Sequence, residues 1–286
     1  MTSNLNPNLP SLLKRFFLLF SGVLTLAACS ADKTAQADRK AAVSNPPQVL
    51  MKPNGAYQTP PYASAAARNP TLSLPSNFSP NAGVTFTNVA NNGNFIALTF
   101  DDGPHPKNTP RLLDILRQRN VKATFYVIGK SVKLYPDIVR RIHAEGHELG
   151  NHTWNHPNLA NLSDAKVRQE LDSTREAIIS AAGVRPRTMR PPYGSLKTTQ
   201  RQMIHRAYGY PTILWDVDPL DWKRPGTSVV RSRILNGTKS GSIVLAHDLH
   251  STTVDAMPST IDALLAKGYR FVTVSQLLAM KDASRP

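Results

Sequence analysis

The 286-residue sequence predicts an α/β fold of alternating parallel strands and helices, preceded by a disordered tether. From about residue 84 onward, short β-branched apolar segments alternate with longer amphipathic ones, the pattern of βα units. Gly146, Gly183 and Gly268 follow helical segments at positions where helices commonly end. Six helices and seven strands over about 190 residues suit an incomplete βα barrel, with a doubly wound sheet as the alternative.

The first 28 residues predict a secretory signal. An apolar run from Phe16 to Ala28 follows Lys14 and Arg15, and it is shorter than the roughly 20 residues that span a bilayer. The residues LAAC, ending at Cys29, are similar to the bacterial lipobox. This resemblance implies cleavage before Cys29 and lipid attachment to it, so the protein would contact the membrane through a lipid anchor. An ordinary signal peptide with an incidental cysteine is the alternative.

Residues 29–81 contain eight prolines among Ala, Ser and Asn, without apolar periodicity. This composition predicts a disordered linker, with an arm folded onto the domain as the alternative. Ser30 follows the cysteine, and by resemblance to the enterobacterial sorting rule it favours the periplasmic side of the outer membrane. The folded domain is expected at residues 82–286, as a monomer.

The composition excludes several classes of protein. One cysteine excludes an intrachain disulfide framework and a Cys-rich zinc module. A hydrophobic fraction of 41% excludes wholesale disorder. The net charge of +15 invites a nucleic-acid interpretation, but no block of five basic residues occurs. The charge therefore indicates attraction to anionic envelope polymers and membranes, and no nucleic-acid partner is expected.

The elements of the domain are expected in the following order. Two β-rich segments, 84–89 and 95–100, flank a turn-prone Asn-Asn-Gly-Asn sequence and predict a hairpin that enters the domain. In a barrel, the carboxyl ends of the strands carry the chemistry. Strands are expected at 95–100, 123–127, 147–151, 188–190, 211–216, 243–247 and 271–274, and helices at 108–119, 131–144, 164–182, 198–207, 228–235 and 254–266.

Two of these strands end in candidate metal ligands. Asp101 and Asp102 follow an apolar strand, where carboxylates are costly unless something compensates them. A metal could take one and leave the other as a base; a capping pair in a turn is the alternative. His152 and His156 share a face if their segment turns helically. Two imidazoles and one carboxylate leave a coordination position open for water, as in catalytic zinc sites.

Three later strand ends carry further candidates. Arg190 precedes Pro-Pro-Tyr-Gly, a rigid segment in which the arginine can hold a carboxylate and a backbone N–H can face an oxyanion. Three carboxylates and two indoles in residues 215–222 suggest a sugar platform with a supporting acid, or an acidic loop with core tryptophans. His247 ends another strand, where a structural role is the commoner alternative. His147 is interpreted as a buried neighbour of the site and His105 as a loop residue.

The order of these motifs resembles the polysaccharide deacetylase family (NodB homology, carbohydrate esterase family 4). The stretches that look like its five motifs are TFDDGP at 99–104, HTWNH at 152–156, RPPYG at 190–194, DPLDW at 218–222 and LAH at 245–247. The similarity extends over about residues 94–274. It implies a distorted (β/α)7 barrel and metal-dependent N-deacetylation of N-acetylglucosamine polymers.

The resemblance also implies a role for each matching residue. It makes Asp101 the general base that activates the water on the metal, with Arg190 orienting it. It makes His247 the general acid, tuned by Asp221. Its remaining implications are metal ligation by Asp102, His152 and His156, oxyanion stabilisation by the backbone N–H of Tyr193, and an acetyl pocket shaped by Trp222 and Leu245. Zinc is the default ion for such a nitrogen and oxygen set, while cobalt, nickel or manganese could occupy it.

Two other functions remain open on the same fold. One is a catalytically silent lipoprotein that binds the envelope, which would predict a broken metal triad or a missing base. The other is a deacylase or deformylase of a small molecule, such as a lipid-linked sugar; the short loops favour an open groove for a polymer instead. Peptidoglycan is favoured by the expected location, and chitin oligosaccharides, exported poly-N-acetylglucosamine and acetylxylan are the alternatives.

Overall fold

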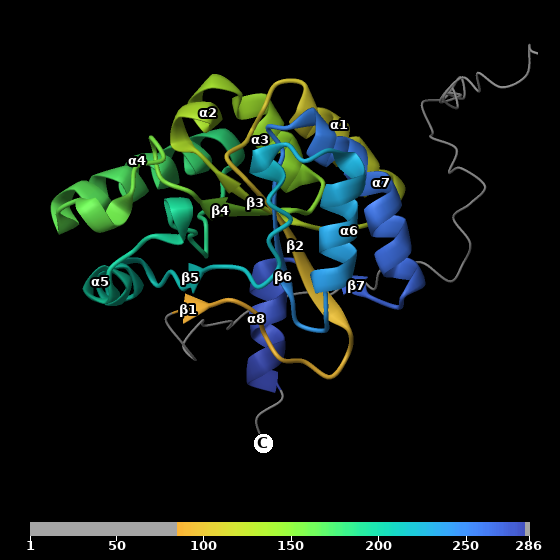
Figure 1. Cartoon of the computed structure of the whole chain (residues 1–286). Helices are drawn as coiled ribbons and strands as arrows, with labels where there is room; N and C mark the ends of the chain where they lie inside the picture. Colours follow the sequence, from red (N-terminus) through yellow and green to blue (C-terminus); the bar gives the residue numbers. More distant parts are fainter. Residues whose placement is uncertain (1–84, 284–286) are drawn as a thin grey trace, which may run out of the picture. The chain divides into compact units, whose positions relative to one another are not determined.

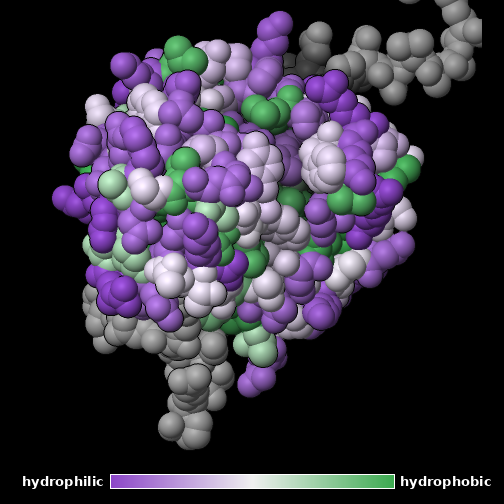
Figure 2. All heavy atoms as spheres, turned by 60° about the vertical axis from the view of Figure 1, so that its left-hand side comes forward, coloured by the Kyte–Doolittle hydropathy of each residue, from purple (hydrophilic) through white to green (hydrophobic). Residues whose placement is uncertain are grey.

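A computed structural model of the chain describes residues 85–283. The predicted signal, Cys29 and the linker to residue 81 lie outside this range. No helix in the described part combines the length and the apolar character needed to cross a membrane. On the face shown in Figure 2, hydrophilic side chains predominate and hydrophobic ones form small separate patches.

Parallel strands form the centre of the domain (Figure 1). The strand β2 (Phe95–Asp101) lies between β3 (Thr124–Val127) and β6 (Ile243–His247), and β4 (Glu148–Asn151) extends the sheet beyond β3. The short strand β7 (Arg270–Phe271) pairs with the amino end of β2. A second parallel pair joins β1 (Thr85–Phe86) to β5 (Thr212–Ile213).

Single bridges connect the two groups of strands into a distorted barrel. Met189 bridges Asn151 at the end of β4 on one side and Thr212 in β5 on the other. Val217, which follows β5, bridges Val244 in β6. These contacts confirm the predicted α/β class and the incomplete βα barrel.

Helices surround this barrel (Figure 1). The helices α6 and α7 pack on each other, α1 packs on α7, and α2 and α3 both pack on α4. Their bounds are α1 (Asn108–Gln118), α2 (Gly129–Leu134), α3 (Pro136–Ala144), α4 (Asp164–Ala182), α5 (Thr198–Tyr208), α6 (Thr227–Gly237), α7 (Ser251–Ala266) and α8 (Val274–Ala283). Short 3-10 helices occur at η2 (Leu159–Asn161), η3 (Pro192–Gly194) and η4 (Asp221–Lys223).

The side chains of β2 alternate between two environments. Ile96, Leu98 and Phe100 belong to the hydrophobic core under the outer helices. Ala97 packs instead in a second cluster with residues of α8, including Leu277. Because side chains of a strand alternate in direction, Asp101 has the same orientation as Ala97. The alternation therefore directs Asp101 inward at the carboxyl end of the strand.

The predicted hairpin between residues 84–89 and 95–100 is wrong. β1 pairs in parallel with β5 and not with β2. Residues 88–89 instead contact the loop before β6, where Val89 N–H donates to the Gly241 carbonyl at 2.9 Å. The physical reason is that β3, β7 and β6 already occupy the two edges of β2.

Other element boundaries also differ from the predictions. The helix expected at 131–144 is split into α2 and α3, because Pro136 cannot donate a backbone hydrogen bond and Tyr135 before it leaves the helical conformation. The strand expected at 188–190 is reduced to the bridges of Met189. The strand expected at 271–274 ends early, and Val274 begins the unpredicted helix α8. The bounds predicted for α4 match the structure.

Candidate active site

Parallel pairing brings the predicted site residues to the same end of the barrel. Asp101 at the end of β2 stands in register with Tyr126 of β3 and with His247 of β6. His152 directly follows β4, and Arg190 directly follows the bridging Met189. Residues far apart in the sequence thus meet because their strands end together.

Three side chains form a possible metal site. The Oδ1 atom of Asp102 lies 3.3 Å from the Nε2 atoms of both His152 and His156. The candidate ligand atoms of the three residues all lie within 4.8 Å of one another. Asp102 Oδ1 is buried and accepts no hydrogen bond from any described residue. A buried carboxylate oxygen without a donor is costly, and a cation between these three atoms would compensate it.

The two histidines converge in a way that the sequence interpretation did not expect. Their segment is not helical: Thr153 and His156 have left-handed backbone angles, with φ of 68° and 60°. Asn151 stabilises the first turn, because its Oδ1 accepts the Thr153 N–H at 2.9 Å. Glu170 of α4 accepts the next two backbone N–H groups at 2.8 Å each. The condition of a helical turn is therefore not met, and left-handed residues bring the two rings together instead.

The hydrogen bond of His152 determines which ring nitrogen is free. Its Nδ1 lies 2.7 Å from the Arg190 carbonyl oxygen. A carbonyl can only accept, so Nδ1 carries the proton and the lone pair of Nε2 faces Asp102. A ligand imidazole held through its other nitrogen is the usual arrangement in metal sites.

Burial and neighbouring charges lower the pKa values of Asp102 and His156 and raise the pKa of His152. Burial alone would raise the pKa of Asp102, but the neighbouring His152 and His156 imidazoles lower it to about 2. Burial lowers the pKa of His156. Burial acts in the same direction on His152, but the nearby Asp101 and Asp102 carboxylates raise its pKa overall. Asp102 is therefore anionic, as a metal ligand must be.

Arg190 anchors Asp101 in the interior. Its guanidinium is fully buried, and Nη1 donates to Asp101 Oδ1 and to Thr99 Oγ1 at 2.7 Å each. Its Nε and Nη2 donate to the carbonyls of residues 213 and 214, and the Tyr126 ring lies 4.3 Å below it. Asp101, which is 3% exposed, is thereby fixed in one orientation by a buried ion pair.

His247 and Asp221 form a second charged pair. The ring Nδ1 of His247 lies 2.9 Å from Asp221 Oδ1, and its backbone N–H donates to Oδ2 at 2.8 Å. Thr253 also donates to Oδ2, so the carboxylate is fixed from several sides. Burial opposes charge on the imidazole, but the hydrogen bond and the charge of Asp221 raise the pKa of His247 to about 9. The imidazole of His247 is thus protonated at neutral pH.

Two exposed aromatic side chains and a buried leucine are the candidates for contact with a substrate. Tyr193 has φ of 59°, and its ring packs edge-on against His156 at 4.7 Å while remaining 69% exposed. Trp222 is 50% exposed, with the Lys223 Nζ 4.9 Å from its ring centroid. Leu245 is buried two residues before His247 on the same strand. The tryptophan expected to shape an acetyl pocket therefore presents a face at the surface.

Several residues that the sequence analysis considered lie elsewhere. In the segment 215–222, Asp216 accepts from Ser242 and from the Ile243 N–H, and Asp218 accepts the Leu220 N–H. Both therefore stabilise the backbone and do not support a sugar platform. The ring of His105 accepts two N–H groups at the start of α1.

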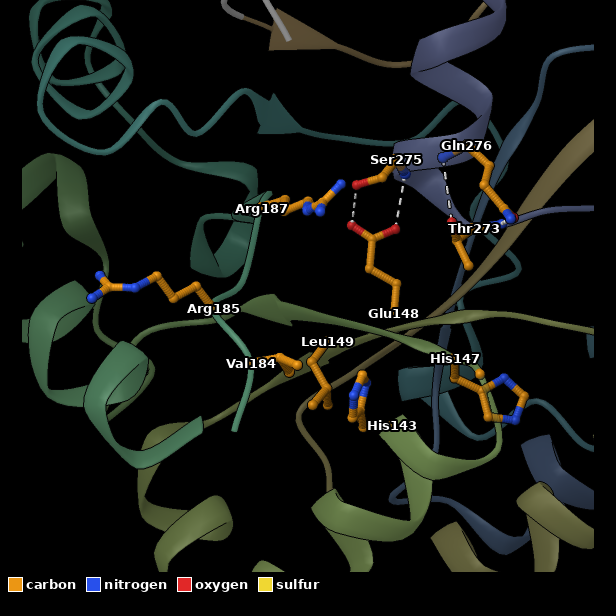
Figure 3. Close-up of a pocket in the computed structure, with 11 residues that line it drawn as sticks. His143, His147, Glu148, Leu149, Val184, Arg185, Arg187, Thr273, Ser275 and Gln276 are labelled. Atoms are coloured by element: carbon orange, nitrogen blue, oxygen red, sulfur yellow. Dashed lines mark hydrogen bonds between the residues drawn. The ribbon is translucent and has the colours of Figure 1, made fainter. Parts of the chain in front are cut away.

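His147 lies at the opposite end of the barrel, so its interpretation as a neighbour of the site is wrong, although it is buried. It precedes β4, where a surface hollow of about 450 Å³ opens (Figure 3). In Figure 3 the Glu148 carboxylate points at Ser275, and the His147 ring points away from it. Its Nδ1 accepts the Ala123 N–H at 3.1 Å.

Three supporting residues were not singled out from the sequence. Thr99 lies two positions before Asp101, which places both on the same face of β2 and could have indicated a shared partner. Asp248 follows His247 directly, but adjacency alone does not predict that its side chain is fully buried. No sequence pattern indicates that the Thr253 hydroxyl donates a hydrogen bond to Asp221.

Comparison with known proteins agrees with this geometry. The sequence profile of a family described as polysaccharide deacetylase matches residues 88–213. A peptidoglycan-N-acetylglucosamine deacetylase of Bacillus cereus is 41% identical over 198 residues, which is 68% of this chain and 92% of that protein. The chain belongs to the polysaccharide deacetylase family. The expectation from the five motifs is confirmed in this respect.

Other relatives within the polysaccharide deacetylase family differ in the substrate that they are named for. A peptidoglycan-N-acetylglucosamine deacetylase of Listeria monocytogenes is 42% identical over 186 residues, 65% of this chain. The match covers 39% of that protein, so this chain spans about two fifths of its length. A chitooligosaccharide deacetylase of Bradyrhizobium is 40% identical over 64% of this chain and 90% of that protein.

Solved structures of polysaccharide deacetylases have the same fold. The Bc1960 peptidoglycan N-acetylglucosamine deacetylase superposes with a TM-score of 0.65 at 37% identity, over 68% of this chain and 92% of that one. BA3943, a CE4 family pseudoenzyme from Bacillus anthracis, gives the same TM-score at 32% identity, over 68% of each chain. The fold thus accommodates both active and inactive members.

Proposed function

We propose that this polysaccharide deacetylase is a metal-dependent hydrolase that removes the acetyl group from N-acetylglucosamine residues of a polymer and releases acetate. One observation carries the proposal. The candidate triad of Asp102, His152 and His156 lies beside two groups of opposite character, the carboxyl group of Asp101 and the imidazole of His247, which are register partners in adjacent strands. That combination provides a proton acceptor and a proton donor at one site, as amide hydrolysis requires.

The metal would be held by Asp102 and by the Nε2 atoms of His152 and His156. These are two nitrogen ligands and one oxygen ligand, for which zinc is the default, with cobalt, nickel or manganese as the alternatives. A divalent ion bound there supplies a water of lowered pKa and a polarised amide carbonyl.

Asp101 is proposed as the general base. Its carboxylate stands one residue before Asp102, and its Oδ2 lies 3.8 Å from His152 Nε2. The Oδ1 atom is committed to Arg190 at 2.7 Å, which leaves Oδ2 to take a proton from the attacking water. Because Arg190 is fixed by two carbonyls as well, the carboxylate keeps one orientation during the reaction.

His247 is proposed as the general acid. As the tetrahedral intermediate collapses, the carbon–nitrogen bond breaks and the sugar nitrogen must accept a proton to leave as an amine. The imidazolium, held by Asp221, supplies that proton from Nε2. The backbone N–H of Tyr193 would donate to the oxyanion from the other side of the site.

The substrate is proposed to be peptidoglycan. The support is the expected envelope location and the relatives named as peptidoglycan-N-acetylglucosamine deacetylases. A chitooligosaccharide is the alternative, since one relative is named for it. Exposed Tyr193 and Trp222 suit either, because aromatic faces pack against sugar rings. We also propose, from the sequence alone, that the protein is a monomer, exported and anchored through lipid on Cys29 at the periplasmic side of the outer membrane.

The test is acetate release by the full chain, purified in detergent and loaded with zinc, from peptidoglycan, chitooligosaccharides and acetylxylan. We expect release from peptidoglycan, with loss in the Asp101→Asn variant. Release from none of the three, together with intact metal binding, would contradict the proposal and favour a silent binder or a small-molecule deacylase. Labelling with a palmitate analogue tests the anchor, and an unlabelled protein would refute it.

A further inference from the structure

Asp248 is a buried carboxyl group beside the candidate site that the proposed reaction does not use. It follows His247 at the end of β6 and is fully buried. Its carboxyl group lies against Gly103, the residue after Asp102. A β-carbon at position 103 would lie 2.5 Å from Oδ2 and 2.6 Å from Oδ1 of Asp248. Only glycine therefore fits between this carboxyl group and the Asp102 turn.

Hydrogen bonds join the same two segments. The Thr109 hydroxyl donates to Asp248 Oδ2 and accepts the His105 N–H at 2.7 Å. One residue away on each segment, the Asn108 Nδ2 donates to the Leu249 carbonyl at 2.9 Å. The loop that begins with Asp102 is thus attached at two places to the segment that follows His247.

The other oxygen of Asp248 is unusual. Oδ1 is buried and has no hydrogen-bond partner among the described residues. An ionised carboxylate in this position would lack a compensating donor. Burial accordingly raises the pKa of Asp248 to about 7, and the negative charges of Asp102 and Asp101 act in the same direction against the bond from Thr109.

The turn that Asp248 supports is itself strained. Asp102 has φ of 73°, in the left-handed region, which for a residue other than glycine persists only where the surroundings enforce it. The carboxyl group of Asp248 fills the space behind that turn.

We propose that Asp248 is a positioning residue, which holds the Asp102–Gly103 turn against the end of β6 and so keeps the ligand oxygen of Asp102 in place relative to His247. The inference rests on the proposed function for its meaning in catalysis. Its effect on metal affinity is measurable without any substrate.

The experiment compares Asp248→Ala and Asp248→Asn in the full chain. Alanine removes the support, and we expect zinc affinity to fall about tenfold or more by calorimetry, with kcat reduced at nearly unchanged KM. Asparagine has the size of the aspartic acid side chain and carries no charge, and we expect zinc affinity and kcat within about threefold of the original. Thr109→Val, which removes the donor to Oδ2, should give an intermediate loss of affinity and decides the matter if the alanine variant does not fold.

Asp216→Asn is the matched control, because Asp216 stabilises the other end of β6 through Ser242 and the Ile243 N–H. It should lower the thermal midpoint without changing zinc affinity. Original zinc affinity and kcat in Asp248→Ala would overturn the proposal. Equal losses in Asp248→Asn and Asp248→Ala would also overturn it, because the charge rather than the shape would then matter. If the original chain releases no acetate, the affinity measurements still decide this inference.

Discussion

Both ends of the barrel carry a buried histidine next to β4 together with a carboxylate, His147 with Glu148 at the amino end and His152 with Asp102 at the carboxyl end. At the amino end, Glu148 accepts four hydrogen bonds, two of them from Ser275 at the start of α8. At the carboxyl end, Asp102 Oδ1 faces two imidazole nitrogens at 3.3 Å and has no donor among the described residues. Similar side chains thus complete the fold at one end and leave a ligand position at the other.

The presence of a hollow does not by itself identify the end that carries the candidate metal ligands. The hollow in Figure 3 lies at the amino end, with exposed Arg185 and Arg187 among its lining residues. His147 there has one buried nitrogen without a partner, but no second ligand converges on it, since the metal-ligand group found among the described residues is at the carboxyl end. Convergence of several unsatisfied groups is therefore the better guide to chemistry.

The strongest test of the difference between the two ends removes one histidine from each of them. His152→Ala should lower zinc affinity at least about 100-fold and kcat/KM at least about 1,000-fold, because it removes a ligand. His147→Ala should cost about 1–3 kcal/mol of unfolding free energy and leave kcat/KM within about threefold. Calorimetry, acetate release and urea unfolding measure these effects. Loss of zinc binding in the His147 variant would remove the distinction.

Asp101→Asn should separate proton transfer from metal binding at the carboxyl end. We expect kcat to fall about 1,000-fold, because the amide cannot accept the proton. Zinc affinity should stay within a few-fold, since the three ligands remain. The measurement is acetate release beside a zinc titration of the same sample. Full activity in this variant would refute the assignment of the base.

Asp221→Asn should weaken His247 as the proposed general acid. The pKa of His247 is about 9 because Asp221 holds its charged form against burial, and the acid works only when protonated. Activity is therefore expected below that pKa and lost as the pH rises through it. The variant should lower kcat about tenfold at neutral pH and move the alkaline limb to lower pH. Asp218→Asn, in the same segment, is the control and should leave the limb in place.

Glu148→Gln at the amino end should have the smallest effect on activity. The loss of a charged acceptor at the start of α8 should cost about 1–2 kcal/mol, measured as a lower urea midpoint. We expect kcat/KM within about twofold of the original, since Glu148 lies at the far end of β4 from His152. A large fall in kcat/KM at full folding would show that the two ends are coupled.

The fold class and the meeting of the candidate site residues at one end of the barrel could be predicted from the sequence, but the pairing of the first strand and the local backbone could not. Asp101, Asp102, His152 and His247 follow apolar segments directly, and parallel strands that end together bring such residues into one place whatever the exact strand lengths. The hairpin was wrong because local β propensity does not reveal which strand occupies the edges of β2.

The local backbone geometry of the site could not be predicted from the sequence either. The spacing of His152 and His156 suggested a helical turn, yet left-handed residues bring the rings together, and their stabilisation by Asn151 and Glu170 depends on tertiary contacts. The burial of Asp248 against Gly103 likewise depends on two segments that are about 145 positions apart. Such contacts have no periodicity or local signature in the sequence.

The register of β2 and β6 has a consequence for how this family can diversify. Asp101 and His247 are direct partners in adjacent strands, which lie about 4.8 Å apart in any sheet. The separation between the proposed base and the proposed acid is thus inherited from backbone pairing. Loops after the strands can lengthen, shorten or change composition, while the interval between the Asp101 and His247 backbone positions stays constant.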